Sequence, residues 1–181
     1  MKQFVSPILL AVSALVASAP ANAITYTYSA VMNAANEPGT VVAPNASGIS
    51  VVTFDTVALT MAINEVWFGL TGPITVNHIH CCTAVAGTGV ANPPIVNFSP
   101  TLTSSGSYLQ TFTLGTATFN QLLFGASDGK AYVNIHTAAN PGGEIRGFLV
   151  GPTVPVPEPR TYALMVAGLA GLGLWSRRRQ A

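Results

Sequence analysis

Short β-rich segments separated by turn-forming residues occupy the middle of this chain and limit the folds that it can adopt. The segments alternate apolar with polar residues, or are brief apolar runs rich in Val, Ile, Phe and Tyr, which is typical of strands. Glycine and proline turns such as Gly72-Pro73 stand between them. The predicted strands are 24–31, 49–54, 57–70, 74–80, 95–98, 108–114, 131–136 and 144–150.

One helix is predicted among these strands. Phe119, Leu122 and Leu123 recur at the spacing of one helical face, so a short helix is expected over residues 117–125. Many short strands, glycine and proline turns and a single helix predict an all-β sandwich or barrel.

Charged residues are scarce and argue against one large class of function. Asp, Glu, Lys and Arg make up 7% of the 181 residues, against about a quarter in ordinary globular domains. A nucleic-acid binder needs many Lys and Arg side chains to neutralise phosphates. We therefore expect no nucleic-acid partner. The 49% of hydrophobic residues is enough for a packed core, which argues against disorder.

The first 23 residues have the features of a secretory signal peptide. Lys2 provides a positive start, residues 8–16 are apolar, and Ala21-Asn22-Ala23 is a small-residue cleavage site. We predict that signal peptidase cleaves after Ala23 and that the domain 24–153 is exported. An N-terminal core helix is the alternative interpretation.

The C-terminal residues predict a membrane segment behind a stiff linker. Prolines fix φ and remove backbone donors in residues 154–160, so this linker is extended. The glycine-rich apolar run 162–175 has no polar face, and the arginines behind it can reach the headgroup layer. We predict a transmembrane helix over 161–181 with its basic end in the cytoplasm and the domain outside. The basic cluster consists of Arg177, Arg178 and Arg179.

The order of these C-terminal parts resembles the PEP-CTERM sorting signal of Gram-negative bacteria. The Pro157-Glu158-Pro159 element, the apolar helix and the arginine cluster follow one another as in that signal. The resemblance implies that an exosortase in the inner membrane processes the protein for the cell surface or the extracellular matrix. It also implies exopolysaccharide or surface proteins as neighbours. A plain membrane anchor is the alternative.

The three histidines of the chain are the only set of residues that predicts a site. His78 and His80 alternate along one predicted strand and therefore share a face, and His136 lies on another strand. Three imidazoles brought together in this way bind zinc or copper. The alternative is that they hydrogen-bond to loop backbone and fix the connections.

The same alternation predicts which way these side chains point. Val133 and Ile135 are expected in the core, so His136 points outward, and the other two histidines share a face with Ile74 and Val76. On the last predicted strand, Glu144 and Arg146 share a face and can form a structural ion pair.

Cys81 and Cys82 follow directly after His80, and three states are open to them. They can form a vicinal disulfide in an oxidising compartment. They can instead add soft ligands to the histidine pair, which would favour zinc or Cu(I). They can also remain buried thiols.

Several segments between residues 24 and 150 form a distinctive set, which includes His78-Ile79-His80, the block 129–137 and the block 140–147. Together they resemble the CHRD domain, which is named for its repeats in chordin. The resemblance implies an immunoglobulin-like antiparallel sandwich or barrel and no enzymatic activity. The sequence departs from the family where Cys81-Cys82 replaces the glycine that usually follows His-x-His. The matching segments are Asn36-Glu37-Pro38, Ser47-Gly48, 70–73, His78-Ile79-His80, 129–137 and 140–147.

We therefore expect a non-enzymatic exported domain that acts as a binding or structural module and holds zinc or copper at its histidines. The alternative is a metalloenzyme similar to copper/zinc superoxide dismutase, whose sandwich also carries a His-x-His pair. Three imidazoles are too few for a two-metal dismutase site, which counts against the enzyme.

Overall fold

The computed structural model describes residues 24–39, 41–42, 45–153 and 169. The predicted signal peptide, proline-rich linker and transmembrane helix lie outside these residues, apart from Leu169. Within the described part, no helix is both long and apolar enough to cross a membrane. The two targeting segments and the sorting signal therefore stay predictions.

Nine strands, one α-helix and one short 3-10 helix make up the domain. They are β1 (Thr25–Asn33), η1 (Ala34–Asn36), β2 (Ser47–Asp55), β3 (Thr60–Phe68), β4 (Ile74–His80), β5 (Pro94–Phe98), β6 (Gly106–Thr113), α1 (Thr116–Ser127), β7 (Tyr132–Thr137), β8 (Ile145–Phe148) and β9 (Val150–Thr153). The prediction of a mostly β fold with one short helix is confirmed.

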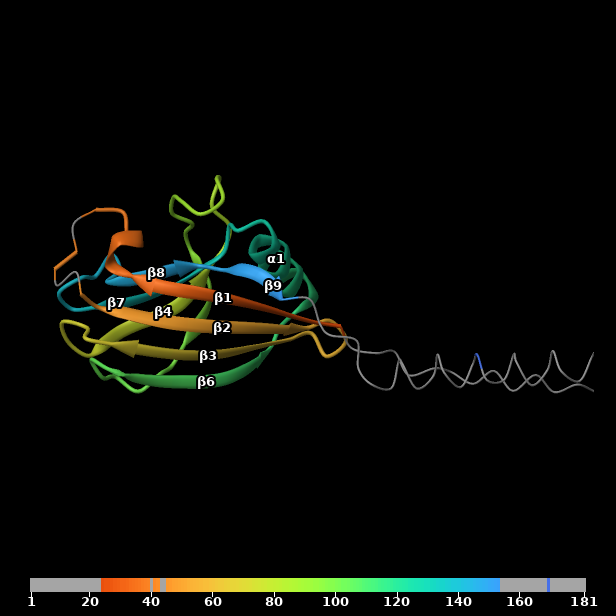
Figure 1. Cartoon of the computed structure of the whole chain (residues 1–181), viewed down its shortest axis with the longest axis horizontal. Helices are drawn as coiled ribbons and strands as arrows, with labels where there is room; N and C mark the ends of the chain where they lie inside the picture. The colour runs from red at the N-terminus through yellow and green to blue at the C-terminus, as the bar shows by residue number, and fades with distance from the viewer. Residues whose placement is uncertain (1–23, 40, 43–44, 154–168, 170–181) are drawn as a thin grey trace, which may run out of the picture.

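All nine strands belong to one antiparallel sheet, whose order is β5-β4-β7-β8-β1-β2-β3-β6, with β9 also paired to β1. The sheet curls so that its two halves face each other across the core, as the layers of a sandwich do (Figure 1). Because β1 pairs with β2 on one side and with β8 and β9 on the other, hydrogen bonding continues from one half to the other. The architecture is therefore a curled half-barrel and not two separate sheets.

Aromatic side chains bring the two edges of the curled sheet together. The Phe98 ring on β5 lies 6.0 Å from the ring of Tyr108 and 5.6 Å from that of Phe112, both on β6. The hydroxyl of Tyr108 also accepts a hydrogen bond from the Ser99 amide at 3.3 Å. Apolar contact thus closes the curl where no backbone ladder does.

The core lies inside the curl, and α1 covers one end of it (Figure 1). Phe54 on β2 contacts Tyr28 on β1 and Phe119 on α1 edge to face, at ring distances of 5.9 and 5.7 Å. Leu122 of the same helix is completely buried. The apolar face that predicted the helix is therefore the face that packs on the sheet.

The expected single strand 144–150 is two strands, β8 and β9. The chain changes neighbours at Leu149, whose amide donates to the Ala131 carbonyl at 2.9 Å while its side chain is buried. After this residue the backbone pairs with β1 instead of β7. The residue pattern along 144–150 cannot reveal such a change of partner.

Candidate metal centre

The structure brings all three histidines together on β4 and β7. These strands are antiparallel neighbours, and their register sets Val76 opposite His136 and Asn134 opposite His78. The ring of His78 lies 4.3 Å from that of His80 and 4.6 Å from that of His136. One ligand nitrogen from each ring lies within 4.8 Å of the other two.

The histidines lie on the outer face of the sheet, but connecting segments cover them. His136 is on the face opposite Val133 and Ile135, as expected, yet every residue of β7 is buried. The exposed fractions of His78, His80 and His136 are only 7%, 4% and 9%. Pointing away from the apolar core therefore does not bring these side chains to solvent.

The segment between β4 and β5 supplies much of this cover. Tyr132 shares its hydroxyl with the backbone of Ala91, at 3.3 Å from the amide and 3.4 Å from the carbonyl. The guanidinium of Arg146 donates to the Gly89 carbonyl at 2.8 Å. These bonds hold the segment over β7 and β8.

The expectation that Ile74 shares the face of His78 and His80 is wrong. An irregularity in the β4–β7 ladder between Ile74 and Val76 shifts the register there. Ile74 is consequently 1% exposed in the core, whereas Val76 is 43% exposed. A bulge of this kind breaks strict alternation and leaves no mark in the hydrophobic pattern.

Hydrogen bonds set the tautomer of His136. Its Nδ1 donates to the Pro141 carbonyl at 2.9 Å, so in the neutral ring Nε2 carries the lone pair. That Nε2 lies 2.8 Å from Nε2 of His78, which must be the donor between the two. The expected bonding of histidine to loop backbone therefore exists, and it orients a nitrogen toward the other rings.

The remaining ring nitrogens lack well-formed hydrogen bonds. Nδ1 of His78 and both ring nitrogens of His80 are buried and make no well-formed hydrogen bond among the described residues, although the Asn97 side chain lies near His78 and the Ala91 backbone near His80. Most buried polar atoms in proteins are paired, so a group of unpaired imidazole nitrogens calls for an explanation. A bound cation would use one nitrogen of each ring, so it would account for one of the two His80 nitrogens and not both.

Burial also keeps the three rings neutral. Burial, helped by His80 and His136, lowers the pKa of His78 to about 4, against the opposing effect of the Asn97 side chain. Burial likewise lowers the pKa of His80, although the Ala91 backbone opposes this, and lowers the pKa of His136 against the bond to Pro141. Neutral imidazole is the form that binds metal ions.

The spacing of the nitrogens nearly fits a metal ion. Nitrogens that each lie about 2.0–2.1 Å from a tetrahedral ion are about 3.3 Å apart. The 2.8 Å between the Nε2 atoms of His78 and His136 is a hydrogen-bond distance. Those two rings would have to separate by about 0.5 Å to admit an ion between them.

An aromatic and cationic stack borders the histidines, and sequence analysis missed it. Tyr132 stacks on His80 with 4.7 Å between the rings and 15° between their planes. The guanidinium of Arg146 lies 5.0 Å from the Tyr132 ring and 5.4 Å from that of Phe148. Strand register brings these rings together, because His80 lies opposite Tyr132 and Tyr132 lies opposite Phe148. The sequence alone does not show which strands are neighbours, so it could not predict this row.

A model of the CHRD domain matches residues 28–149. The chain belongs to the CHRD domain family. No curated protein and no solved structure matches it.

A buried carboxylate fixes the β7–β8 connection of this CHRD domain. Glu144 accepts hydrogen bonds from the Thr71 amide at 2.7 Å, the Thr71 hydroxyl at 2.6 Å, the Asn140 side chain at 2.9 Å and the Thr137 hydroxyl. Although burial opposes it, these four donors lower the pKa of Glu144. The connection that they hold contains Pro141, the partner of His136.

The expected ion pair between Glu144 and Arg146 is wrong. Arg146 instead lies 3.9 Å from Glu37, measured from Nε to Oε2, and also donates to the Asn36 carbonyl. Burial raises the pKa of Glu37 to about 7, although the arginine opposes this rise. The partner comes from η1 and its cap, which only the fold brings near.

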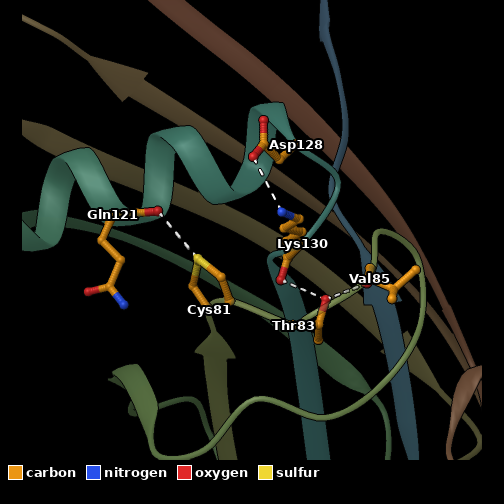
Figure 2. The surroundings of a disulfide bond; sticks show 7 residues. Cys81, Thr83, Val85, Gln121, Asp128 and Lys130 are labelled. Carbon is orange, nitrogen blue, oxygen red and sulfur yellow. Dashed lines mark hydrogen bonds and ion pairs between the residues drawn. A yellow bond between two sulfur atoms is a disulfide. The ribbon is translucent and has the colours of Figure 1, made fainter.

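The two cysteines are joined to each other and contact the helix of the CHRD domain (Figure 2). Sγ of Cys81 lies 3.4 Å from the Gln121 carbonyl on α1. A Cβ added to Gly125 would lie 2.6 Å from Sγ of Cys82 and closer still to that of Cys81. Of the three states left open, the structure has the vicinal disulfide, and the donor group consists of histidines alone.

Proposed function

We propose that this CHRD-domain protein is an exported, non-enzymatic binding module that holds one zinc or copper ion at His78, His80 and His136. The observation that carries the proposal is the meeting of three buried imidazoles, each of which offers one ligand nitrogen within 4.8 Å of the others. Nitrogen donors of this kind suit zinc and copper.

The surroundings of the site favour holding an ion over turning over a substrate. Backbone segments cover the histidines, and none of the three is more than 9% exposed. The alternative, a copper/zinc superoxide dismutase-like enzyme, needs imidazoles for a second ion. The whole sequence has only three histidines, and all of them belong to this one group.

Export and sorting complete the proposal. Signal peptidase would remove residues 1–23, and exosortase would then process the protein at the inner membrane and pass it to the cell surface or the extracellular space. There it would meet exopolysaccharide or surface proteins. The disulfide between Cys81 and Cys82 supports an oxidising compartment outside the cytoplasm.

Metal analysis of the processed protein tests the binding function. After loading with zinc or with copper and removal of the excess, we expect one ion per chain. His78→Ala and His136→Ala should lose it, while Val76→Ala, on the same face but half-exposed, should retain it. The copper-loaded protein should not speed the removal of superoxide. Rapid superoxide removal with stoichiometric copper would favour the enzyme instead.

Fractionation of cells tests the sorting. Replacing Glu158 with Gln, or deleting Arg177–Arg179, should leave the full-length protein in the inner membrane. Unchanged release to the surface after either change would contradict recognition by exosortase.

A further inference from the structure

We infer that the ion selected by the three-histidine site is Cu(I) in preference to zinc or another divalent ion. The inference rests on the proposed function, because it concerns which ion the same three side chains hold. It follows from the charge of the donors, from the charges beside them and from the room around them.

The donor set itself carries no negative charge. Among the residues that the structure describes, no carboxylate and no thiolate joins His78, His80 and His136. The sulfur atoms of Cys81 and Cys82, which follow His80 in the chain, are bonded to each other, and that of Cys81 contacts α1. The site with its ion would therefore keep the full charge of that ion, which is +1 for Cu(I) and +2 for zinc.

Burial makes this difference in charge important. The three rings are almost fully covered, and the cost of moving an ion out of water rises with the square of its charge. A divalent ion thus pays about four times the penalty of a monovalent ion of similar size in the same surroundings. Proteins usually offset this penalty with anionic ligands, and this site has none.

The charges next to the site add to the preference. The guanidinium of Arg146 lies 5.0 Å from the Tyr132 ring, which stacks on His80 at 4.7 Å. The carboxylates nearby are engaged elsewhere, since Glu37 pairs with that guanidinium and Glu144 accepts four hydrogen bonds. A divalent ion would therefore be repelled by the Arg146 guanidinium more strongly than a monovalent ion, and no nearby carboxylate in the described part of the chain is left to offset that repulsion.

The packing of the rings points the same way. Zinc bound by three protein ligands normally takes a water as its fourth ligand and needs room for it. Here His78 is flanked by both other imidazoles, and Tyr132, tied to Ala91, covers His80. Cu(I) is stable with only two or three nitrogen ligands, so it needs no such opening.

Asn134 allows the charge argument to be tested without a change of shape. It lies between His78 on β4 and Arg146 on β8, is 4% exposed, and its Oδ1 has no hydrogen-bond partner among the described residues. Asn134→Asp would add one negative charge beside the site. Asn64→Asp makes the same change on β3, where the side chain is exposed, and serves as the matched control.

The experiment compares the two ions on the full processed protein. Cu(I) is titrated without oxygen against the chelator bicinchoninate, and zinc is titrated against a colorimetric zinc chelator. We expect one Cu(I) per chain, with a Kd on the order of 100-fold below that of zinc. For Asn134→Asp, the logarithm of the zinc affinity should rise about twice as much as that of Cu(I), because Coulomb energy scales with ionic charge. Asn64→Asp should change neither affinity.

The possible outcomes separate this inference from the proposed function. If zinc binds as tightly as Cu(I) or more tightly, and His78→Ala loses both, the preference is wrong and the metal-binding function stands. If Asn134→Asp folds, as judged by circular dichroism, yet affects both ions equally, the charge argument fails. If neither ion binds to the folded protein, both the inference and the proposed function are overturned.

Discussion

The two halves of the curled sheet, β1-β2-β3-β6 and β5-β4-β7-β8, differ in how far the residues on their outer faces are exposed to solvent. In β1, β2 and β3, buried residues alternate with more exposed ones such as Val31 and Ile49, and in β6 partly buried residues are interspersed with exposed ones such as Leu109. In β7 all six residues are buried. The outer face around β7 is covered by connecting segments, and it is there that the histidines, Tyr132 and Arg146 gather. The candidate site lies where connecting segments cover the outer face of the sheet and bury the polar side chains on it.

The largest expected effect on stability comes from shortening an apolar side chain in the core. The same change on the outer face of the first half should have almost no effect. Ile135 on β7 is completely buried, so Ile135→Ala should lower the free energy of unfolding by about 2–5 kcal/mol. Val51 on the outer face of β2 is 36% exposed, and Val51→Ala should stay within about 0.5 kcal/mol. Urea unfolding followed by circular dichroism measures both. Equal losses would mean that the outer face of the first half is also buried.

Two buried glutamates should respond unequally to the same isosteric change. Glu144→Gln replaces an oxygen that accepts from Thr71 or Asn140 by an amide that cannot, and should cost about 2–3 kcal/mol. Glu65→Gln should cost less than about 1 kcal/mol, because Gln can still accept the hydrogen bond that Asn77 donates to Glu65. The midpoints of chemical unfolding measure the difference. A larger loss at Glu65 would contradict the assignment of the stabilising network to the β7–β8 connection.

The contact between the disulfide and α1 joins the ends of the two halves and should tolerate no added atom. Gly125→Ala would set a methyl group against both sulfur atoms, and we expect a loss of about 1–3 kcal/mol. Gly72→Ala meets nothing within 4 Å and should change stability by less than about 0.5 kcal/mol. Thermal unfolding of both variants tests this. If Gly125→Ala were neutral, the cysteines would not pack on the helix as described.

The pH dependence of stability should distinguish a buried base of one half from a buried acid of the other. The pKa of His78 falls from 6.5 to about 4 on folding, so the unfolded chain binds more protons between these values and stability rises with pH there. The pKa of Glu65 rises from 4.5 to about 7, mainly through burial, so stability declines as the pH rises across that interval.

Variants separate these opposing contributions. Against wild type, His78→Gln should lose the rise between about pH 4 and 6.5, and Glu65→Gln should lose part of the decline up to about pH 7. Part of the decline should remain because Glu37, whose pKa is also raised to about 7, contributes in the same direction. Unfolding free energies measured in metal-free buffer at intervals of pH check this, and profiles parallel to wild type would refute the shifts.

Much of the fold could be read from the sequence because alternation and turn residues are local signals. The limits of β4 agree with prediction, and the strands of the first half, β1, β2, β3 and β6, differ from it by a few residues at their ends. The helix was predicted from three apolar residues, two of which, Phe119 and Leu122, are buried. The bulge after Ile74 and the change of partner at Leu149 were missed, because both depend on the neighbouring strand.

The amino-acid sequence by itself determined the β-rich character of this CHRD domain, its single helix, its poverty of charge and the identity of its only three imidazoles, since these depend on composition and short-range periodicity. Only the tertiary structure decided that the histidines meet, that loops bury them beside Tyr132 and Arg146, and that Arg146 pairs with Glu37 rather than Glu144. The physical reason is register: residues far apart in the chain become neighbours through strand pairing, and a shift of one position sends a side chain to the other face.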